Sequence, residues 1–542
     1  MSEPTLADTV RRAIRQPDTL QLGAIPLLYP ILETLGLRDC INALCPTQAD
    51  LDLGRVMLVL VLNRLMSPQP LCWVNRWVAQ TVLGIMLDLP LAKLYDQRLG
   101  RTLDAVYPHL GEIWEQLVVR AIQVWKLDLS ILHWDITSFF FTGAYTDSEL
   151  IRYGHNRDQV SDAKQINLQA DITHRSRVPV GYRVLAGQTA DITTPPGHLE
   201  ALLRFLARPE LAGLNRHPLL VSDCKMITPE AVGACHRHQL FYLGPWAQNK
   251  AVAQVLCSVS EDELAAHPLT YRPQRQVENT AFVPYRGVWR PFPIQVAPPP
   301  NQPHAPSEVF TDRVLVCWSA GKARLDVQKR QTYLKRLLEG MENIRRHLNQ
   351  GRYAKRDYVV EQIGHVRRGN PAKRLVWFDL QGEDDHLHLK FRIDRERLAA
   401  EQAVDGRYAL GTNATHLSAD EALTIFKAQD DAEKQFHTVK GPLAVRPVFL
   451  HTDERIEGVV FLTLVALLVR ALLGLECQPA GLQVSADRVL AEFAPWSVID
   501  LTLRDGMHVQ QVATPTDFQS RVMGTLGVPP CERYLTRLSS QD

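Results

Sequence analysis

The stretch from Phe426 to Lys440 reads Phe-Lys-Ala-Gln-Asp-Asp-Ala-Glu-Lys-Gln-Phe-His-Thr-Val-Lys, and the rest of the chain is best interpreted outward from it. It contains neither glycine nor proline, and Gly441-Pro442 follows it, so the sequence predicts one helix that ends there. Four of its side chains are spaced three, four and seven residues apart and are expected on one helix face: Phe426, Gln429, Glu433 and Lys440. By itself this pattern is also typical of a solvated face with Glu–Lys pairs.

Composition places the chain among ordinary globular proteins. With 542 residues and a net charge of +1, about two to four domains are expected, and any nucleic-acid site must come from local clustering of basic residues. The nine cysteines are scattered and form no C-x-x-C pair, which indicates reduced thiols in a cytoplasmic protein and excludes a disulfide framework or a zinc ribbon. Cys235-His236-Arg237-His238 is the strongest candidate ligand cluster, but a helix end explains it better.

Two strongly apolar runs bear on membrane association. Val56–Leu62 and Val459–Val469 are shorter than a bilayer-spanning helix requires, and Arg64 and Arg470 close them. Both predict buried core helices. The first residues are polar and charged and resemble no signal peptide, so we expect no membrane partner.

The order of elements predicts an α/β fold. Residues from about 20 to 127 have helical periodicity. Three strands, a helix, a strand, a helix and a strand then follow, which predicts a mixed sheet flanked by helices. In chain order these segments are Leu129–Phe140, Gln165–Ile172, Val178–Leu185, Leu199–Leu206, His217–Asp223, Pro229–His238 and Gln239–Leu243.

Acidic residues stand at informative places in this order. Asp135 lies in the middle of a strand and Asp223 at the end of another. Two carboxylates that converge repel each other unless a cation lies between them, and hard oxygen ligands suit Mg²⁺ or Mn²⁺. Glu433 would complete a cage for two ions about 4 Å apart, the arrangement that supports phosphoryl displacement. Taken singly, each aspartate is more often a turn or strand-end residue.

A basic segment follows the middle of the chain. Residues 322–374 contain fifteen Lys and Arg against five Asp and Glu, an excess of ten positive charges, and tyrosines are interleaved among them. This predicts a phosphate-contacting surface, and a solvated helix face is the alternative. Trp318 and Trp377 would either stack on an extruded base or be buried, and burial is favoured. The named candidates for DNA contact are Lys329, Arg330, Lys335, Arg336, Arg345 and Arg346.

These residues together resemble the DDE transposases of bacterial insertion sequences, in the superfamily with the signature Y-(2)-R-(3)-E-(6)-K. Phe426-(2)-Gln429-(3)-Glu433-(6)-Lys440 reproduces its spacing. The resemblance runs from about Gly23 to the last sixty residues. Further stretches similar to one branch of that superfamily are Pro26–Glu33, Val59–Leu65, His133–Ser138, Ser222–Met226 and Tyr408–Asn413.

The resemblance implies an RNase H-like catalytic core in which Asp135, Asp223 and Glu433 are the catalytic, metal-binding triad for two Mg²⁺ or Mn²⁺ ions. It implies a transposase that cuts double-stranded DNA at element ends, joins it to target DNA and works as a homodimer, cytoplasmic and at the nucleoid when bound. The expected parts are an N-terminal helical domain (1–127), the two core segments (128–245 and 406–480), a β-rich insertion domain with the basic stretch (246–405) and a C-terminal region (481–542).

Two departures from the signature leave alternatives open. Phe426 lacks the hydroxyl of the family's tyrosine, and Gln429 lacks the charge of its arginine, whereas Lys440 keeps a point charge for the DNA backbone. All three remain candidates for DNA contact. A catalytically silent DNA-binding remnant and a general metal-dependent nuclease are therefore the competing hypotheses.

Overall fold

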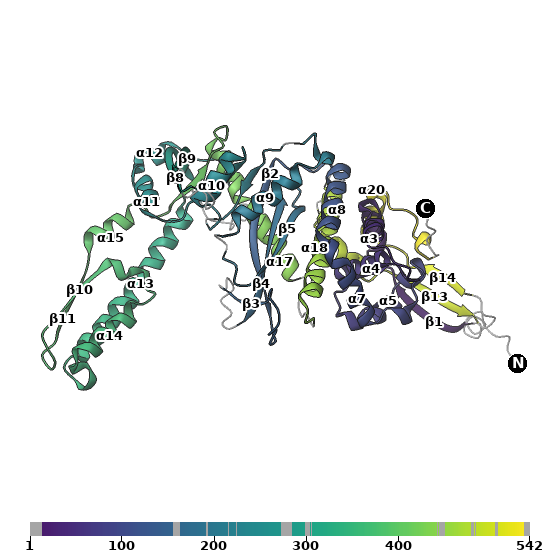
Figure 1. The fold of residues 1–542 in the computed structure, drawn as a ribbon, viewed down its shortest axis with the longest axis horizontal. Coiled ribbons are helices and arrows are strands. Elements are labelled where there is room, and N and C mark those ends of the chain that lie inside the picture. The colour runs from purple at the N-terminus through teal and green to yellow at the C-terminus, as the bar shows by residue number, and fades with distance from the viewer. Residues whose placement is uncertain are drawn as a thin grey trace. The chain divides into compact units, whose positions relative to one another are not determined.

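The computed structural model describes residues 14–154, 163–190, 193–214, 216–223, 225–272, 284–298, 304, 306–441, 443, 450–478, 482, 484–503 and 508–535. These form two compact units, drawn in Figure 1. Unit 1 comprises residues 1–221 and 428–542, and unit 2 comprises residues 222–427. Unit 1 thus joins the expected N-terminal and C-terminal regions to part of the core. The proline-rich loop at 298–306 falls mostly outside the described residues.

The helical part of unit 1 is built around the long helix α18 (Asp453–Cys477), which packs against α2, α4, α7 and β5. α4 is buried almost along its whole length because it is apolar on all sides, as the sequence predicted. The helices that precede the first long strand are α2 (Ile25–Leu35), α3 (Leu37–Leu44), α4 (Leu53–Met66), α5 (Val74–Ala79), α6 (Leu83–Met86), α7 (Asp96–Val106) and α8 (Leu110–Trp125).

The helix α18 is longer than its apolar run suggested. Its 25 residues extend the expected Val459–Val469 core at both ends, and among the described helices it is the one long and apolar enough to cross a membrane. However, 83% of its most apolar window is buried inside the protein. The expectation of a buried core helix is therefore confirmed, while the expectation that the segment is too short to span is corrected.

The two ends of the described chain form one small sheet. Strand β1 (Ile14–Gln21) pairs antiparallel with β13 (Ser497–Leu503), which pairs with β14 (His508–Val512). β1 was not predicted from the sequence, and Pro17 is tolerated within it because β1 is an edge strand. Helices α19 (Ala486–Phe493) and α20 (Asp517–Leu526) accompany this sheet.

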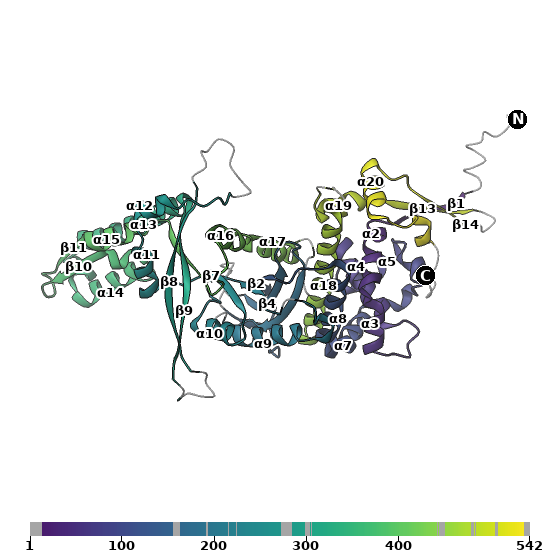
Figure 2. The same ribbon diagram turned by 90° about the horizontal axis from the view of Figure 1, so that it is seen from above.

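The mixed sheet of unit 1 agrees with the predicted order. β2 (Ile131–Phe141) pairs antiparallel with β4 (Lys164–Thr173) and parallel with β6 (Leu219–Val221). β3 (Arg152–Tyr153) and β5 (Pro179–Ala186) lie along the other edge of β4. Helices α9 (Pro195–Leu206) and α17 (Gln429–Lys440) cover opposite faces of this sheet (Figure 2).

Unit 2 contains an antiparallel set of strands in the order β7, β12, β9 and β8. These are β7 (Phe241–Pro245), β12 (Arg407–Thr412), β9 (Glu308–Trp318) and β8 (Arg286–Val296). The predicted strand Gln239–Leu243 corresponds to β7 with shifted ends, and the resembling stretch Tyr408–Asn413 covers most of β12. Four short helices pack with them: α10 (Pro229–Arg237), α11 (Lys250–Cys257), α12 (Glu261–Ala266) and α16 (Ala419–Lys427).

The basic segment forms a separate lobe of unit 2, here called the arm. α13 (Ala320–His347) and α14 (Arg356–Arg367) lie side by side, as Figure 1 shows. After them in the chain come the hairpin of β10 (Val376–Gln381) and β11 (His388–Ile393) and then α15 (Arg395–Gln402). The arm has its own apolar core, which includes Leu337, Met341, Ile344, Val359 and Ile363. Residues 246–405 were expected to be β-rich, and their described elements include strands β8, β9, β10 and β11 as well as helices α11–α15.

Candidate functional site

The expected helix from Phe426 to Lys440 is broken at Ala428, whose φ of −71° and ψ of −5° separate α16 from α17. Phe426 therefore belongs to α16 and does not share a helix with the other signature residues, which corrects the prediction of one continuous helix. Next to the break, within unit 2, the Lys427 ammonium lies 5.4 and 5.5 Å from the rings of Tyr285 and Tyr408. Gly441 ends α17, as predicted.

Gln429 fastens α17 to strand β2 within unit 1. Its Oε1 lies 2.9 Å from His133 Nδ1, and its Nε2 donates to the Trp134 carbonyl at 3.4 Å. Since an amide oxygen only accepts, His133 carries its proton on Nδ1, and its Nε2 accepts from His174 Nδ1 at 2.8 Å when both rings are neutral. The Gln429 side chain is buried, so in this structure it holds a helix on a strand and faces no solvent through which DNA would approach.

Asp135 lies two residues beyond His133 and on the same face of β2, because side chains alternate along a strand. It is half-buried, and its Oδ1 accepts the Ile136 N–H at 2.7 Å. Trp134 points to the other face, where it stacks on His198 of α9 with ring centroids 4.0 Å apart. The face of β2 that carries Asp135 is therefore the face that α17 covers.

Asp223 follows the parallel partner strand. His133 of β2 pairs with Val221 of β6, so Asp135 and Asp223 each come two residues after a paired position. Asp223 is half-buried, and its Oδ1 accepts the N–H of Lys225 at 3.0 Å.

Glu433 and Lys440 are both on α17. Glu433 is exposed one turn after Gln429, and Lys440 is the half-buried last residue of the helix. Among the residues that the structure describes, no three His, Cys, Asp or Glu side chains are gathered closely enough to hold a metal ion. The carboxylates of Asp135, Asp223 and Glu433 are chemically suited to such an ion, because carboxylate oxygens are the ligands that Mg²⁺ and Mn²⁺ prefer.

The arm carries the basic surface, but its named candidates differ in availability. Arg330 is committed to Asp405 through two contacts of 2.7 and 2.5 Å and is largely buried. Arg345 and Arg346 both pair with Glu342, at 2.8 and 3.4 Å, and Lys335 lies 3.9 Å from Glu339. Of the six candidates, Lys329 and Arg336 are therefore the most available for phosphate contact.

Four further basic residues of the same segment join them on the surface of the arm. Among the described residues of 322–374, six exposed cations make neither an ion pair nor a side-chain hydrogen bond, and they are Arg324, Lys329, Arg336, Arg352, Arg368 and Lys373. A cavity of about 390 Å³ between α13 and α14 is lined by Arg336, Arg368 and His365. Counting charges identified this segment, but only the structure shows which cations lack an acidic neighbour.

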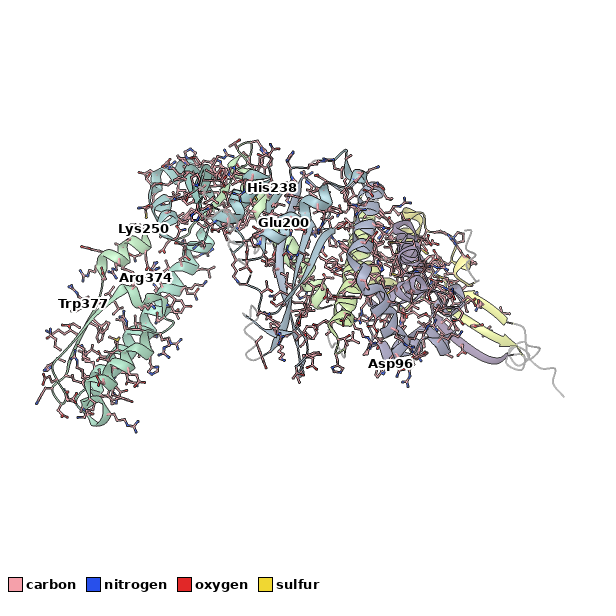
Figure 3. All side chains as sticks on the ribbon, viewed as in Figure 1. Asp96, Glu200, His238, Lys250, Arg374 and Trp377 are labelled. Carbon is pink, nitrogen blue, oxygen red and sulfur yellow. The ribbon has the colours of Figure 1, made fainter. Side chains whose placement is uncertain are left out.

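Trp377 is exposed, which corrects the expectation that it is buried. Its side chain is 47% exposed on β10, and the Arg392 guanidinium lies 5.4 Å from its ring (Figure 3). Trp318 is half-buried beneath Arg286, whose guanidinium is 4.6 Å from the ring.

The cysteine and histidine cluster at 235–238 is structural, as expected. His236 bonds to Asp312 at 2.8 Å and stacks on Phe310 near the end of α10. The eight described cysteines are free thiols, and Cys224 lies outside the described residues.

Comparisons with known proteins give one family match. Residues 18–118 match the family model described as a domain of unknown function, DUF4277. No curated protein matches the sequence. Among solved structures, the piggyBac transposase synaptic complex with hairpin DNA, determined by cryo-EM, is similar over 88% of this chain and 82% of its own, with 7% identity and a TM-score of 0.40. A similarity of that degree does not establish the function of this chain.

Proposed function

We propose that this chain is a DDE-type transposase that cuts DNA at the ends of a mobile element and joins them to target DNA. The observation that carries the proposal is the fastening of α17 to β2 by Gln429, which puts the helix of Glu433 on the strand face of Asp135. The matched domain at residues 18–118 is one found in transposases, which supports the same class. The mixed sheet with helices on both faces is compatible with an RNase H-like core.

In this proposal Asp135, Asp223 and Glu433 hold two divalent ions, Mg²⁺ or Mn²⁺. The ions would stabilise the attacking and leaving oxygens of the phosphodiester. Asp135 supports this role because it lies on the face of β2 that α17 covers, and Asp223 is proposed from its carboxylate two residues after β6. Glu433 is exposed to solvent and accessible to a substrate that approaches α17.

The DNA would be held by cations outside this group. Lys440 supplies a positive charge at the end of α17, and the exposed cations of the arm, including Arg336 and Arg368, supply a phosphate-contacting surface. We propose that the enzyme acts on double-stranded DNA as a homodimer in the cytoplasm.

The first prediction concerns the three acids. The purified full chain is incubated with Mg²⁺ or Mn²⁺ and labelled duplex DNA from both flanks of its gene. We expect nicking at a defined position, and Asp135→Asn, Asp223→Asn and Glu433→Gln should each lower its rate by at least about 100-fold, because each removes a charge that offsets a cation. DNA binding, followed by mobility shift, should change little.

Asp96→Asn serves as the control, since Asp96 is exposed at the start of α7 and should leave nicking unchanged. Nicking that survives any one of the three substitutions would remove that residue from the site. Cutting without end specificity would instead indicate a general nuclease.

A catalytically silent DNA-binding protein is the second candidate, and the same Gln429 favours it. Both polar groups of the amide are used within unit 1, so this position offers no charge to a phosphate. That candidate predicts a mobility shift of the flanking DNA with no nicking by the wild-type chain in either metal.

A further inference from the structure

A cavity of about 460 Å³ lies within unit 1, away from the acids discussed above. It opens on the sheet face that carries Trp134 and its strand neighbour Asp171, and these two residues are paired between β2 and β4. Asp135 points to the opposite face. The walls come from α8, β5, α9 and the second turn of α18, and they are mainly apolar and aromatic, including Leu110, Trp114, Tyr182, Leu202 and Phe205.

Asp171 places a carboxylate in this cavity. Its side chain is 7% exposed, and its Oδ1 accepts no hydrogen bond from the described residues. His198 Nε2 lies 3.2 Å from that oxygen but is not oriented to donate to it. A carboxylate buried without donors is costly, so a donor from outside the chain would be strongly favoured here.

Gly181 is what makes room for that carboxylate. It is paired with Asp171 across β4 and β5, and a Cβ at this position would collide with Asp171 Oδ2. Any other residue would push the carboxylate out of its place over β5. The sequence therefore keeps an acid exposed to the cavity and buried from bulk water.

Glu457 of α18 is a second acid on the cavity wall. Its Oε1 accepts from the Tyr107 hydroxyl at 3.4 Å, and burial raises the pKa of its carboxyl. The third acid, Glu115, is neutralised by Arg208 at 2.6 Å. Two arginines also line the cavity, Arg183 and Arg204, and Arg183 lies against Gly197 of α9.

We propose that this cavity binds a small organic cation with a planar aromatic body, such as an amidine or a protonated amine. The charged head would donate to Asp171, and the body would lie against Trp114 and Tyr182, whose rings meet edge to face with centroids 5.1 Å apart. Aromatic faces attract cations, and the volume lies in the range of small-molecule sites. The proposal does not depend on the DNA-cutting function.

The test is titration calorimetry of the full chain with benzamidine, and with neutral benzamide and anionic benzoate as matched probes. We expect benzamidine to bind with millimolar affinity and the other two at least about tenfold more weakly. Asp171→Asn keeps the shape of the side chain and should weaken benzamidine at least about tenfold. Glu200→Gln, at an exposed position of α9, a helix of the cavity wall (Figure 3), should leave benzamidine binding unchanged.

A second variant guards against misfolding of the first. Ala201→Phe fills the cavity without altering its charge and should abolish benzamidine binding while the circular dichroism spectrum stays that of the wild type. Equal binding of benzoate would show that Arg183 and Arg204 dominate and would overturn the proposal. So would unchanged benzamidine affinity in both variants, or no benzamidine binding by the wild type at about 10 mM.

Discussion

Gln429 shows how the role of a single residue depends on its surroundings. From the sequence, its side chain was a candidate for DNA contact. Here the amide is buried and joins a helix to a strand that lies 296 positions earlier in the chain. At the scale of the residue, a neutral buried amide makes an internal contact and offers no charge to a phosphate.

Removal of this contact should destabilise unit 1. Gln429→Ala leaves the His133 ring and the Trp134 carbonyl without their partner in a buried place, and this should lower the free energy of unfolding by about 1–3 kcal/mol. Chemical denaturation followed by tryptophan fluorescence measures it. Asp430→Ala is the control, because its ion pair with Lys434 is at the surface and should contribute under about 1 kcal/mol. Equal effects of the two substitutions would show that the Gln429 contact adds nothing to stability.

At the scale of the element, the buried helix α4 depends on how its N-terminus is held. The Asp52 side chain accepts the Arg55 N–H at 2.8 Å and also meets Asn42, at 3.0 Å, and Arg38, at 3.1 Å. Burial works against ionisation of this carboxyl, but the hydrogen bonds and the arginines outweigh it and lower its pKa to about 2. An apolar helix with few polar contacts of its own is thus positioned by its cap.

The lowered pKa predicts a pH dependence. Because the folded-state pKa of Asp52 lies below the value of 3.8 for the unfolded chain, its stabilisation is complete above about pH 4 and is lost as the pH falls towards 2. Asp52→Ala should lower the free energy of unfolding by about 1–3 kcal/mol at pH 7. The difference in this free energy between the variant and the wild type should shrink between pH 4 and 2. Denaturant melts at several pH values test this. For Asp96→Ala, at the exposed start of α7, the difference in unfolding free energy from the wild type should be much smaller.

At the scale of the whole molecule, charge is distributed unevenly between the parts of a nearly neutral chain. The net charge is +1, yet residues 322–374 carry an excess of ten positive charges, and six of the exposed cations there make neither an ion pair nor a side-chain hydrogen bond among the described residues. Three acids outside that segment, Asp405, Glu401 and Asp384, offset Arg330, Arg374 and Lys355. The arm therefore retains a positive surface although the molecule as a whole does not.

This distribution predicts how DNA binding depends on salt. The logarithm of the affinity for duplex DNA should fall linearly with the logarithm of the salt concentration, because phosphate contacts release counterions. Arg336→Ala and Arg368→Ala should each reduce the slope by about 1. Lys250→Ala, at an exposed position of α11 outside the arm (Figure 3), should leave the slope unchanged. Fluorescence anisotropy at several salt concentrations measures the slopes, and identical slopes for all four proteins would exclude the arm from DNA binding.

The sequence predicted most elements of the sheets because periodicity and turn residues are local signals. β2, β4, β5, α9 and α10 lie close to where the pattern placed them. It missed β1, whose pairing with β13 is set by contacts across nearly the whole chain. It also missed the break at Ala428, since neither glycine nor proline marks it.

For the candidate site, the sequence by itself determined the residue types: carboxylates at Asp135, Asp223 and Glu433, and a surplus of cations in one segment. Only the tertiary structure decided that Gln429 is internal, that Arg330 is paired, that Trp377 is exposed and that Asp171 lies in a cavity. The physical reason is that a side chain's charge and size are fixed by its identity, whereas its partners and its exposure depend on what distant segments bring beside it.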